Sequence, residues 1–311
     1  MIYDFDRVID RRRTNSNKWR KYPADVLPLW VADMDFPSPE PVVRAMRERV
    51  EHGVYGYGFE DAEFAEVFTE RVRQRYGWKV SPEAVVLIPG VIPGFNVACR
   101  ALTSPGDGLL MQVPVYPPIL RSPGNHDLTR DEAPLGRERD GRYVADLDAF
   151  HAAIHGRTRA FLLCNPHNPV GRVFTRDELA GMAAICLERS LPIIADEIHC
   201  DLLYSGQQHV PMASLAPEIE QRTITLMAPS KTFNLAGLKV SIAVIPNPAL
   251  RERSLAARGD FVQAQVNIMG YAAALAAYRD GHEWLQQLMR YLEANRDYLG
   301  DYVREHLPGV T

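Results

Sequence analysis

The chain has 311 residues, of which 46% are hydrophobic and 24% are charged. This composition is ordinary for a globular protein with a substantial core, and the length predicts one large domain with a smaller one, or two domains. The net charge of −4 gives no indication of a nucleic-acid partner. Because no apolar run approaches the length that crosses a membrane, we expect no membrane association and a soluble, cytoplasmic protein.

The first forty residues are rich in proline and aromatic residues, and they predict an extended arm rather than a domain core. The run Arg11–Arg13 is the only basic cluster, and we interpret it as a solvated turn. Four cysteines are widely spaced with no CxxC pair, which favours reduced thiols over a metal site or disulfides. They are Cys99, Cys164, Cys186 and Cys200.

Short apolar runs rich in Val, Ile and Leu recur along the chain with helical stretches between them. Nearly continuous hydrophobicity is typical of strands covered on both faces, so the pattern predicts an α/β fold. The expected strands are Val85–Ile88, Gly108–Val113, Ala160–Cys164, Ile193–Ala195, Thr223–Met227 and Val240–Ile245.

Three helices can be predicted from their signals. Gly94–Leu102 follows the first strand, and Thr175–Arg189 opens with Thr175 and Glu178 at capping-box spacing. A long helix from about His282 to Leu307 has its apolar positions on one face. Those positions are Trp284, Leu288, Leu292, Leu299 and Val303.

Several expected strands end directly in polar or turn-forming residues. In open α/β sheets, ligands bind beyond the carboxyl ends of the strands, so this placement predicts a site there. The segments concerned are Pro89-Gly90, Asn165-Pro166, Asp196-Glu197 and Pro229-Ser230-Lys231.

The most informative of these segments is Ser230-Lys231. A lysine amine that forms a Schiff base, a carboxylate at a strand end and an asparagine in a turn are what pyridoxal 5′-phosphate (PLP) requires of a protein. Lys231, Asp196 and Asn168 supply these three groups in order. Taken alone, Lys231 would be an ordinary surface lysine, but its position after a strand and the two accompanying groups favour the Schiff-base role.

Asp196 ends an apolar strand, where an unpaired carboxylate is costly. Opposite a pyridinium nitrogen it would keep that nitrogen protonated, and the alternatives are a helix cap or a salt bridge. We interpret Glu197 as structural. His199 either hydrogen-bonds the ring hydroxyl or is a packed histidine. Asn168, in an Asn-Pro-x-Asn-Pro turn, either aims its amide at a ligand or only forms the turn.

The remaining candidates are weaker when each is taken alone. The backbone of Gly90, Val91 and Ile92 precedes a helix start and would make a phosphate cradle, or an ordinary strand-to-helix turn. Tyr116 either stacks on the cofactor ring or is a core tyrosine. Ser230 and Lys239 are candidate phosphate contacts that could also be merely structural.

Taken together, these residues resemble fold-type I PLP enzymes of the class I/II aminotransferase superfamily. The closer resemblance is to the cystathionine β-lyase branch called the MalY/PatB type, and it runs from Tyr3 to the last residue. The segments that carry it are 30–36 (Trp-Val-Ala-Asp-Met-Asp-Phe), 52–57 (His-Gly-Val-Tyr-Gly-Tyr), 196–199 (Asp-Glu-Ile-His) and 230–238 (Ser-Lys-Thr-Phe-Asn-Leu-Ala-Gly-Leu).

The resemblance implies a three-layer large domain with a mostly parallel sheet and an incomplete small α/β domain. Its expected divisions are an arm over residues 1–45, the PLP-binding domain over 46–270 and the start of a truncated small domain over 271–311. It also implies that Tyr57 reaches the cofactor phosphate of a neighbouring subunit, and hence a homodimer with shared active sites. His199 stands where relatives often carry a tyrosine.

Two departures from the superfamily pattern concern phosphate binding: lysine stands at Lys239 where many members have arginine, and Ala228 where many have serine. No residue can be assigned as the arginine that binds the substrate carboxylate. The resemblance implies a carbon–sulfur β-lyase that cleaves cystathionine or other cysteine S-conjugates to thiol, pyruvate and ammonia. The alternatives are an aminotransferase and a non-catalytic PLP-binding or regulatory protein.

Overall fold

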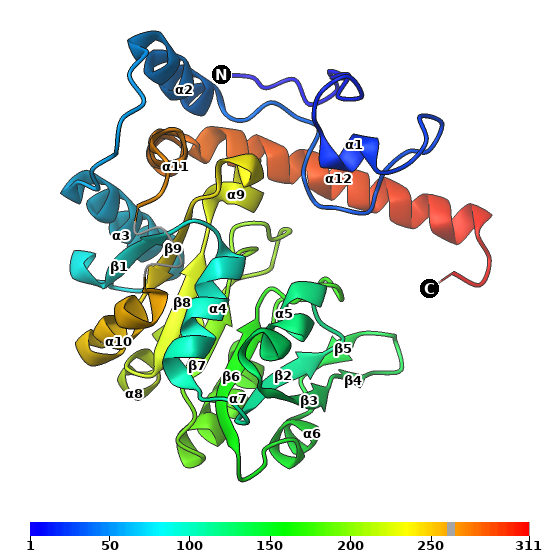
Figure 1. Cartoon of the computed structure of the whole chain (residues 1–311). Coiled ribbons are helices and arrows are strands. Elements are labelled where there is room, and N and C mark those ends of the chain that lie inside the picture. The colour runs from blue at the N-terminus through cyan, green and yellow to red at the C-terminus, as the bar shows by residue number, and fades with distance from the viewer. Residues whose placement is uncertain (260–264, 311) are drawn as a thin grey trace.

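The structure is a computed structural model, and it describes residues 1–259 and 265–310. Its centre is a seven-stranded sheet with the order β1-β9-β8-β7-β6-β2-β3 (Figure 1). Strands β2, β3, β6, β7 and β8 run parallel, while β9 is antiparallel to both β8 and β1. The strands are β1 (Val85–Ile88), β2 (Gly108–Val113), β3 (Thr129–Pro134), β6 (Thr158–Cys164), β7 (Ile193–Asp196), β8 (Thr223–Met227) and β9 (Ser241–Val244), with a separate hairpin of β4 (Gly136–Arg137) and β5 (Tyr143–Val144).

The predicted mostly parallel sheet is confirmed, and β1, β2 and β8 have the predicted bounds. The other three expected strands differ by one or two residues at an end, since β6 begins at Thr158, β7 ends at Asp196 and β9 covers only Ser241–Val244. Strand β3 was not predicted. It is a sheet-edge strand whose residues alternate between buried and exposed, so it lacks a continuous apolar run.

Helices flank the sheet and fill the connections between its strands (Figure 1). They are α1 (Asn17–Arg20), α2 (Glu40–His52), α3 (Ala62–Tyr76), α4 (Val91–Leu102), α5 (Pro117–Arg121), α6 (Leu147–Ala152), α7 (Arg176–Glu188), α8 (Pro217–Glu220), α9 (Pro229–Thr232), α10 (Pro248–Arg258), α11 (Ile268–Asp280) and α12 (His282–His306). Short 3₁₀ helices are η1 (Pro82–Ala84), η2 (Ser122–His126), η3 (Met212–Ser214) and η4 (Ala236–Leu238).

The helix predictions are mostly confirmed. Thr175 caps α7, and its hydroxyl accepts from the Glu178 backbone while the Glu178 side chain accepts from the Thr175 backbone, which is a complete capping box. The helix expected from Gly94 begins three residues earlier at Val91, because Gly90 supplies the non-helical cap. Helix α12 begins at His282 as predicted, but its apolar face is buried only in the first half, since Leu299 is 61% exposed.

The sheet has a hydrophobic layer on each face, which confirms the predicted three-layer α/β architecture. Along β2, Leu109 and Met111 point to one face and pack in a cluster with Phe95 of α4. Leu110, between them, points to the opposite face and packs with Met182 of α7. Successive side chains of a strand alternate between faces, so a run of apolar residues needs helices on both sides.

A third hydrophobic cluster joins the two ends of the chain. It brings together Phe5 of the N-terminal arm, Phe68 of α3 and Trp284 of α12, and it extends to Phe233 and Ile242 beside the sheet. Helices α11 and α12 therefore lie across one end of the sheet, with the arm beside α12 (Figure 1). The divisions at residues 45/46 and 270/271 stay predictions, because this cluster contains side chains from all three predicted segments.

Up to Pro39 the arm contains one short helix, α1, and is otherwise irregular, and the start of α2 completes it, but the arm is not loosely attached. Arg11 pairs with Asp33 at 2.8 Å and with Asp35 at 2.6 Å, and Lys18 donates to Asp35 at 2.7 Å. The prediction of a solvated turn is therefore wrong for Arg11, whose guanidinium is held by two carboxylates. The neighbouring Arg12 and Arg13 are exposed as expected.

Candidate active site

The polar segments that follow the parallel strands lie together at one edge of the sheet, beyond the carboxyl ends of those strands. Strands β6, β7 and β8 are neighbours, and Cys164 and Asp196 pair in register at their carboxyl ends. The residues that follow β6, β7 and β8 therefore lie close together, and β2 adds the segment that leads to Tyr116. This is the edge at which ligands bind in open α/β sheets.

Lys231 lies in the short helix α9, directly after β8. Its Nζ donates a hydrogen bond to the backbone oxygen of Ala32, 2.9 Å away and 199 residues distant in the chain. Burial lowers the pKa of this amine, and the carboxylates of Asp33 and Asp196 oppose that shift. A lysine with a lowered pKa that remains reachable is suited to attack an aldehyde or to accept a proton.

Asp196 is the last residue of β7, and only 4% of it is exposed. Its Oδ1 accepts from the backbone N–H of Ile198 at 3.2 Å. Burial raises the pKa of this carboxyl to about 7, the Ile198 hydrogen bond opposes that shift, and the Glu197 carboxylate adds to it. None of the lysines, arginines and histidines that the structure describes lies within 4.0 Å of this carboxylate, so its ionised form lacks a close cation.

Glu197 and His199 differ in their surroundings. Glu197 is fully buried and accepts from His209 Nε2 and from the Met212 backbone N–H, both at 2.8 Å, which are the contacts of a structural residue. His199 is half-buried, and burial lowers its pKa to about 4, with the Lys231 charge adding to the shift. The imidazole is therefore neutral at physiological pH and can donate from one ring nitrogen and accept at the other.

Tyr116 and Asn168 follow β2 and β6, which lie on the same side of β7 in the sheet. Tyr116 caps α5 and is half-buried, and its pKa is raised by burial and then by the Asp196 carboxylate, so the two residues are near each other. Asn168 lies in the turn after β6, where its backbone N–H contacts the thiol of Cys164, the register partner of Asp196. The structure thus brings together Lys231, Asp196, His199, Tyr116 and Asn168.

The turn of Gly90, Val91 and Ile92 joins β1 to α4. Gly90 has φ +123°, a backbone conformation that residues with a side chain rarely adopt. Val91 and Ile92 are the first two residues of α4 rather than residues before it. Their N–H groups lack partners within the helix, which is the arrangement that binds anions. Ser241 fixes the turn, because its hydroxyl donates to Ile88 O at 3.0 Å and accepts from Gly90 N at 3.2 Å. Sequence reasoning missed Ser241.

Ser230, Lys239 and Tyr57 are the least defined members of the predicted site. Ser230 lies in α9 beside Lys231, and its backbone oxygen accepts from Leu235 N. Lys239 is exposed, with a left-handed backbone at φ +55°. Tyr57 is fully exposed, in the segment between α2 and α3. No described contact joins Lys239 or Tyr57 to Lys231.

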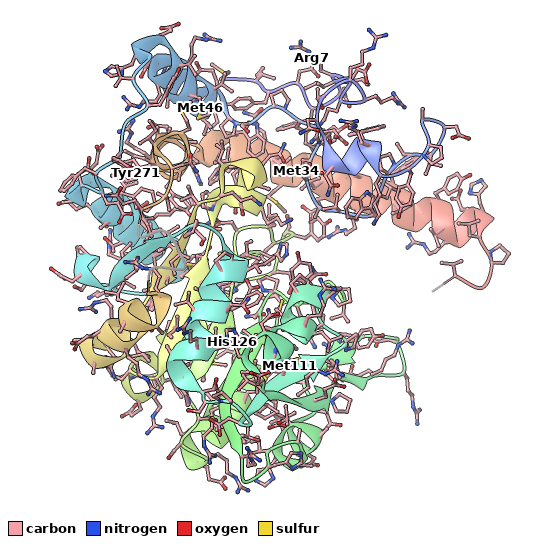
Figure 2. The ribbon with its side chains drawn as sticks, in the orientation of Figure 1. Arg7, Met34, Met46, Met111, His126 and Tyr271 are labelled. Carbon is pink, nitrogen blue, oxygen red and sulfur yellow. The ribbon has the colours of Figure 1, made fainter. Side chains whose placement is uncertain are left out.

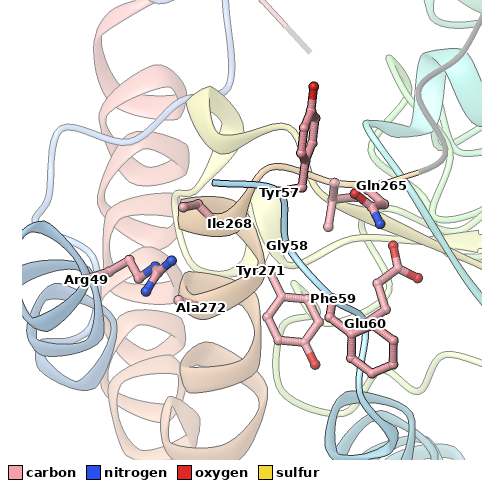
Figure 3. Close-up of a pocket in the computed structure, with 10 residues that line it drawn as sticks. Arg49, Tyr57, Gly58, Phe59, Glu60, Gln265, Ile268, Tyr271 and Ala272 are labelled. Carbon is pink, nitrogen blue, oxygen red and sulfur yellow. The ribbon is translucent and has the colours of Figure 1, made fainter. Parts of the chain in front are cut away.

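Tyr57 lines a separate hollow of about 280 Å³ between the segment before α3 and the start of α11 (Figure 3). Tyr57 is the only predicted site residue among the described residues that line it, and Lys231 and Asp196 lie elsewhere. Its lining residues are Arg49, Tyr57, Gly58, Phe59, Glu60, Gln265, Val266, Ile268, Tyr271 and Ala272.

Sequence reasoning also missed the connection between the arm and the lysine segment. The Asn234 side chain accepts from Met34 N at 3.0 Å and donates to Met34 O at 2.8 Å and Phe36 O at 2.9 Å. Met34 accordingly lies beside α9 (Figure 2). Asn234 has φ +59°, a conformation in which asparagine is enriched, but nothing in the sequence identifies its partners.

A buried charge cluster supports the other side of α9. Asp201 accepts from Arg71 at 2.8 Å, from Tyr76 at 2.7 Å and from the Thr232 hydroxyl at 3.2 Å. Burial would raise the pKa of Asp201, but the two cations Arg71 and Arg75 lower it to about 2. The cluster therefore ties α3 and the turn after β7 to the residue next to Lys231.

The residues present fit PLP. Asp196 is a buried carboxylate without a close protein cation, which is the partner that a pyridinium N–H needs. Lys231 supplies an amine of lowered pKa for the aldehyde, and the start of α4 supplies N–H groups for the phosphate. Among the described residues, no group of three or more His, Cys, Asp or Glu side chains is arranged to hold a metal ion. The four cysteines are free and buried.

The fold and this site define a PLP-dependent enzyme of fold type I. The chain matches the aminotransferase class I and II family over residues 24–310, and it belongs to that family. It is 37% identical to cystathionine beta-lyase PatB of Bacillus subtilis (strain 168), an alignment that covers 99% of this chain and 81% of that protein.

Two solved structures share the fold over nearly the whole chain. Cystalysin from Treponema denticola, which contains PLP, has a TM-score of 0.95 and 32% identity, covering 99% of this chain and 80% of that one. The PLP-bound C-S lyase from Staphylococcus hominis has a TM-score of 0.93 and 34% identity, covering 99% and 79%. Of the helices that the structure describes, none is both long and apolar enough to cross a membrane.

Proposed function

We propose that the protein is a PLP-dependent carbon–sulfur β-lyase that cleaves cystathionine or related cysteine S-conjugates. The observation that carries this proposal is the identity of 37% with a cystathionine β-lyase over 99% of the chain. The arrangement of Lys231, Asp196 and Tyr116 at the sheet edge supports it, because these groups suit the cofactor that the reaction needs.

The residues have separate tasks in the reaction. When bound, PLP provides an electron sink for the carbanion formed at the substrate α-carbon. The Asp196 carboxylate holds the ring nitrogen protonated, and Asn168 and His199 offer hydrogen-bond donors to the ring hydroxyl. Tyr116 would stack on the ring, and the turn of Gly90, Val91 and Ile92 would hold the phosphate through the N–H groups of Val91 and Ile92, with Ser230 and Lys239 as further phosphate contacts.

Lys231 performs the proton transfers. Its free amine accepts the α-proton of the substrate, and the bond between the β-carbon and sulfur breaks with its electron pair on sulfur. The ammonium of Lys231 can then return the proton to the departing thiolate. Addition of water to the remaining three-carbon unit gives pyruvate and ammonia, so that all atoms are accounted for.

The test is incubation of the PLP-loaded protein with cystathionine. We expect homocysteine, pyruvate and ammonia in equal amounts. Bound PLP without thiol or pyruvate would refute the proposal, and conversion of the cofactor to its amine form with a 2-oxo acid acceptor would favour an aminotransferase instead. Absence of turnover on every amino acid tested, together with tight cofactor binding, would favour a regulatory protein.

The role of Lys231 has a matched control. Lys231→Ala should prevent covalent capture of PLP by borohydride and reduce turnover by at least about 10³-fold, because it removes both the attachment point and the base. Lys79→Ala changes an exposed lysine and should have no effect on either. Peptide mass mapping that finds the label on another lysine would contradict the assignment.

We also propose a homodimer with shared active sites, in the cytoplasm. Tyr57 is fully exposed in a segment with several other exposed apolar side chains, which supports a partner surface there. These neighbours are Val54, Tyr55 and Phe59. The four free cysteines support a reducing compartment.

A mixing experiment tests the shared site. Lys231→Ala and Tyr57→Phe subunits, each impaired alone, are unfolded together and refolded at equal amounts. If each site takes Tyr57 from the partner, hybrid dimers contain one intact site, and roughly a quarter of all sites should regain native turnover. A mixture no more active than the sum of its components would rule out sharing.

A further inference from the structure

The arm places a backbone carbonyl in contact with the active-site lysine and a carboxylate close enough to act on its charge. Ala32 O accepts from Lys231 Nζ at 2.9 Å, and the next residue is Asp33. Asp33 Oδ2 pairs with Arg11 at 2.8 Å, while Oδ1 is buried and has no hydrogen-bond partner among the described residues. The free oxygen is an unusual feature, because buried carboxylate oxygens are normally satisfied.

The position of Asp33 is fixed from both sides. The Asn234 side chain holds the backbone of Met34, the residue after Asp33, to the segment that carries Lys231. On the other side, Arg11 bridges Asp33 and Asp35, and Lys18 donates to Asp33 O at 2.9 Å. The carboxylate therefore keeps a constant position relative to Lys231, which a charge on a mobile loop would not do.

Four charged or titratable groups surround the lysine. The carboxylates of Asp33 and Asp196 raise the pKa of Lys231 against the effect of burial, with Asp33 the stronger of the two. His199 is neutral over the physiological range because its pKa is lowered to about 4, and Arg11 pairs with Asp33. Since Asp196 pairs with the cofactor nitrogen under the proposed function, Asp33 remains as the anion for Lys231.

We propose that Asp33 is a positioning residue for the proposed reaction, the counter-ion that stabilises the ammonium form of Lys231. Ala32 O orients this ammonium and Asp33 Oδ1 balances its charge without a direct ion pair, since the two groups are more than 4.0 Å apart. The α-proton of the substrate moves to Nζ, remains there while the carbon–sulfur bond breaks, and then moves to the thiolate. Asp33 itself gains and loses no proton.

The chain suits a direct test, because it contains only five lysines. In the cofactor-free full-length protein, the amine of Lys231 can be titrated by the pH dependence of its labelling with trace acetic anhydride, followed by peptide mass spectrometry. The exposed lysines Lys21, Lys79 and Lys239 are internal references, whereas Lys18 belongs to the same network as Asp33. This readout requires no turnover, so it is independent of whether the protein is a lyase.

Two substitutions break the same ion pair and predict opposite shifts. Asp33→Asn removes the anion and should lower the pKa of Lys231 by about one unit, a tenfold change in the amine fraction below that pKa. Arg11→Gln removes the cation that neutralises Asp33 and should raise the pKa of Lys231. Asp25→Asn removes an exposed carboxylate from the same arm and should change nothing.

The opposite signs separate electrostatics from loosening of the arm. A loosened arm would expose Lys231 to solvent in both variants and shift its pKa in the same direction. If the pKa of Lys231 shifted in the same direction in Asp33→Asn and Arg11→Gln, or did not shift in Asp33→Asn, the proposal would be overturned.

In the PLP-loaded enzyme, the limb of the pH profile of kcat that reports Lys231 should move to lower pH in Asp33→Asn by the amount measured in the labelling experiment. An unmoved limb would overturn the catalytic part alone. If the native protein had no lyase activity, the proposed function would be refuted, but the effect of Asp33 on the pKa of Lys231 would not be.

Discussion

Asp196→Asn should make the cofactor-free protein more stable while it destroys the site. Burial raises the pKa of Asp196 from its ordinary 3.8 to about 7, a difference of about three units. At 1.36 kcal/mol for each unit, the buried carboxylate destabilises the folded state by about 4 kcal/mol once it is ionised. An uncharged amide of nearly the same shape avoids this cost, which is the reason for the expected gain.

The sign of the pH dependence follows from proton binding. Between pH 4 and 7 the folded protein holds the Asp196 proton and the unfolded chain has lost it, so the contribution of this group to stability falls as pH rises. The difference in unfolding free energy between Asp196→Asn and the native chain should therefore grow from pH 4 to 7 and become constant above pH 7. His199, whose pKa of about 4 gives the opposite trend below pH 6.5, is present in both proteins and cancels.

Urea denaturation of cofactor-free protein, followed by circular dichroism from pH 4 to 8.5, measures this difference. Asp25→Asn, at an exposed position, is the matched control and should follow the native curve. The same Asp196→Asn protein should bind PLP weakly and turn over cystathionine at least about 10²-fold more slowly, since the ring nitrogen loses its anion. If the unfolding free energies of the variant and the native chain changed in parallel with pH, the view that Asp196 is a buried carboxylate without a compensating cation would be refuted.

Three further outcomes are expected. Asp201→Asn leaves Arg71 buried beside an uncharged partner and should reduce the unfolding free energy by about 3–5 kcal/mol, measured by urea denaturation. Asn234→Ala removes three hydrogen bonds between the arm and the segment that follows Lys231, so at about 1 kcal/mol each it should lower the unfolding free energy by about 3 kcal/mol. Rapid proteolysis within the first forty residues of the folded variant would show that the arm has detached. His199→Gln should leave the shape of the kcat profile between pH 5 and 8 unchanged, because the native imidazole is already neutral there; a lost acidic limb would contradict this.

The sheet could be predicted because its signals are local. Continuous apolar runs located six strands, and the capping pair Thr175 and Glu178 located the start of α7. Strand ends were less well predicted, since the pairing of Thr158 with Gly108 depends on a neighbouring strand and not on the residue itself. Strand β3 was not predicted for the same reason. Its alternating, charged sequence forms a strand only because it pairs with β2.

The site was predictable where chemistry is tied to strand ends and unpredictable where it depends on distant contacts. Lys231, Asp196 and Asn168 follow buried strands, so their convergence could be expected from topology. The partners of Asn234 and Lys231 in the arm lie about 200 residues away, and no periodicity or spacing encodes that contact. Arg11 was misjudged for the same reason, because its two carboxylates come from a later part of the arm.

The bond between Asn234 and the arm also constrains the order of events during synthesis. Residues 34 and 36 leave the ribosome about two hundred residues before Asn234, whose side chain binds their backbone oxygens. The arm therefore lacks this partner while the central strands are synthesised. Nascent chains fold as segments emerge, and contacts of such high sequence separation form last. The contact between the arm and the residues around Lys231 can therefore form only after residue 234 has been translated, so shorter nascent chains lack it.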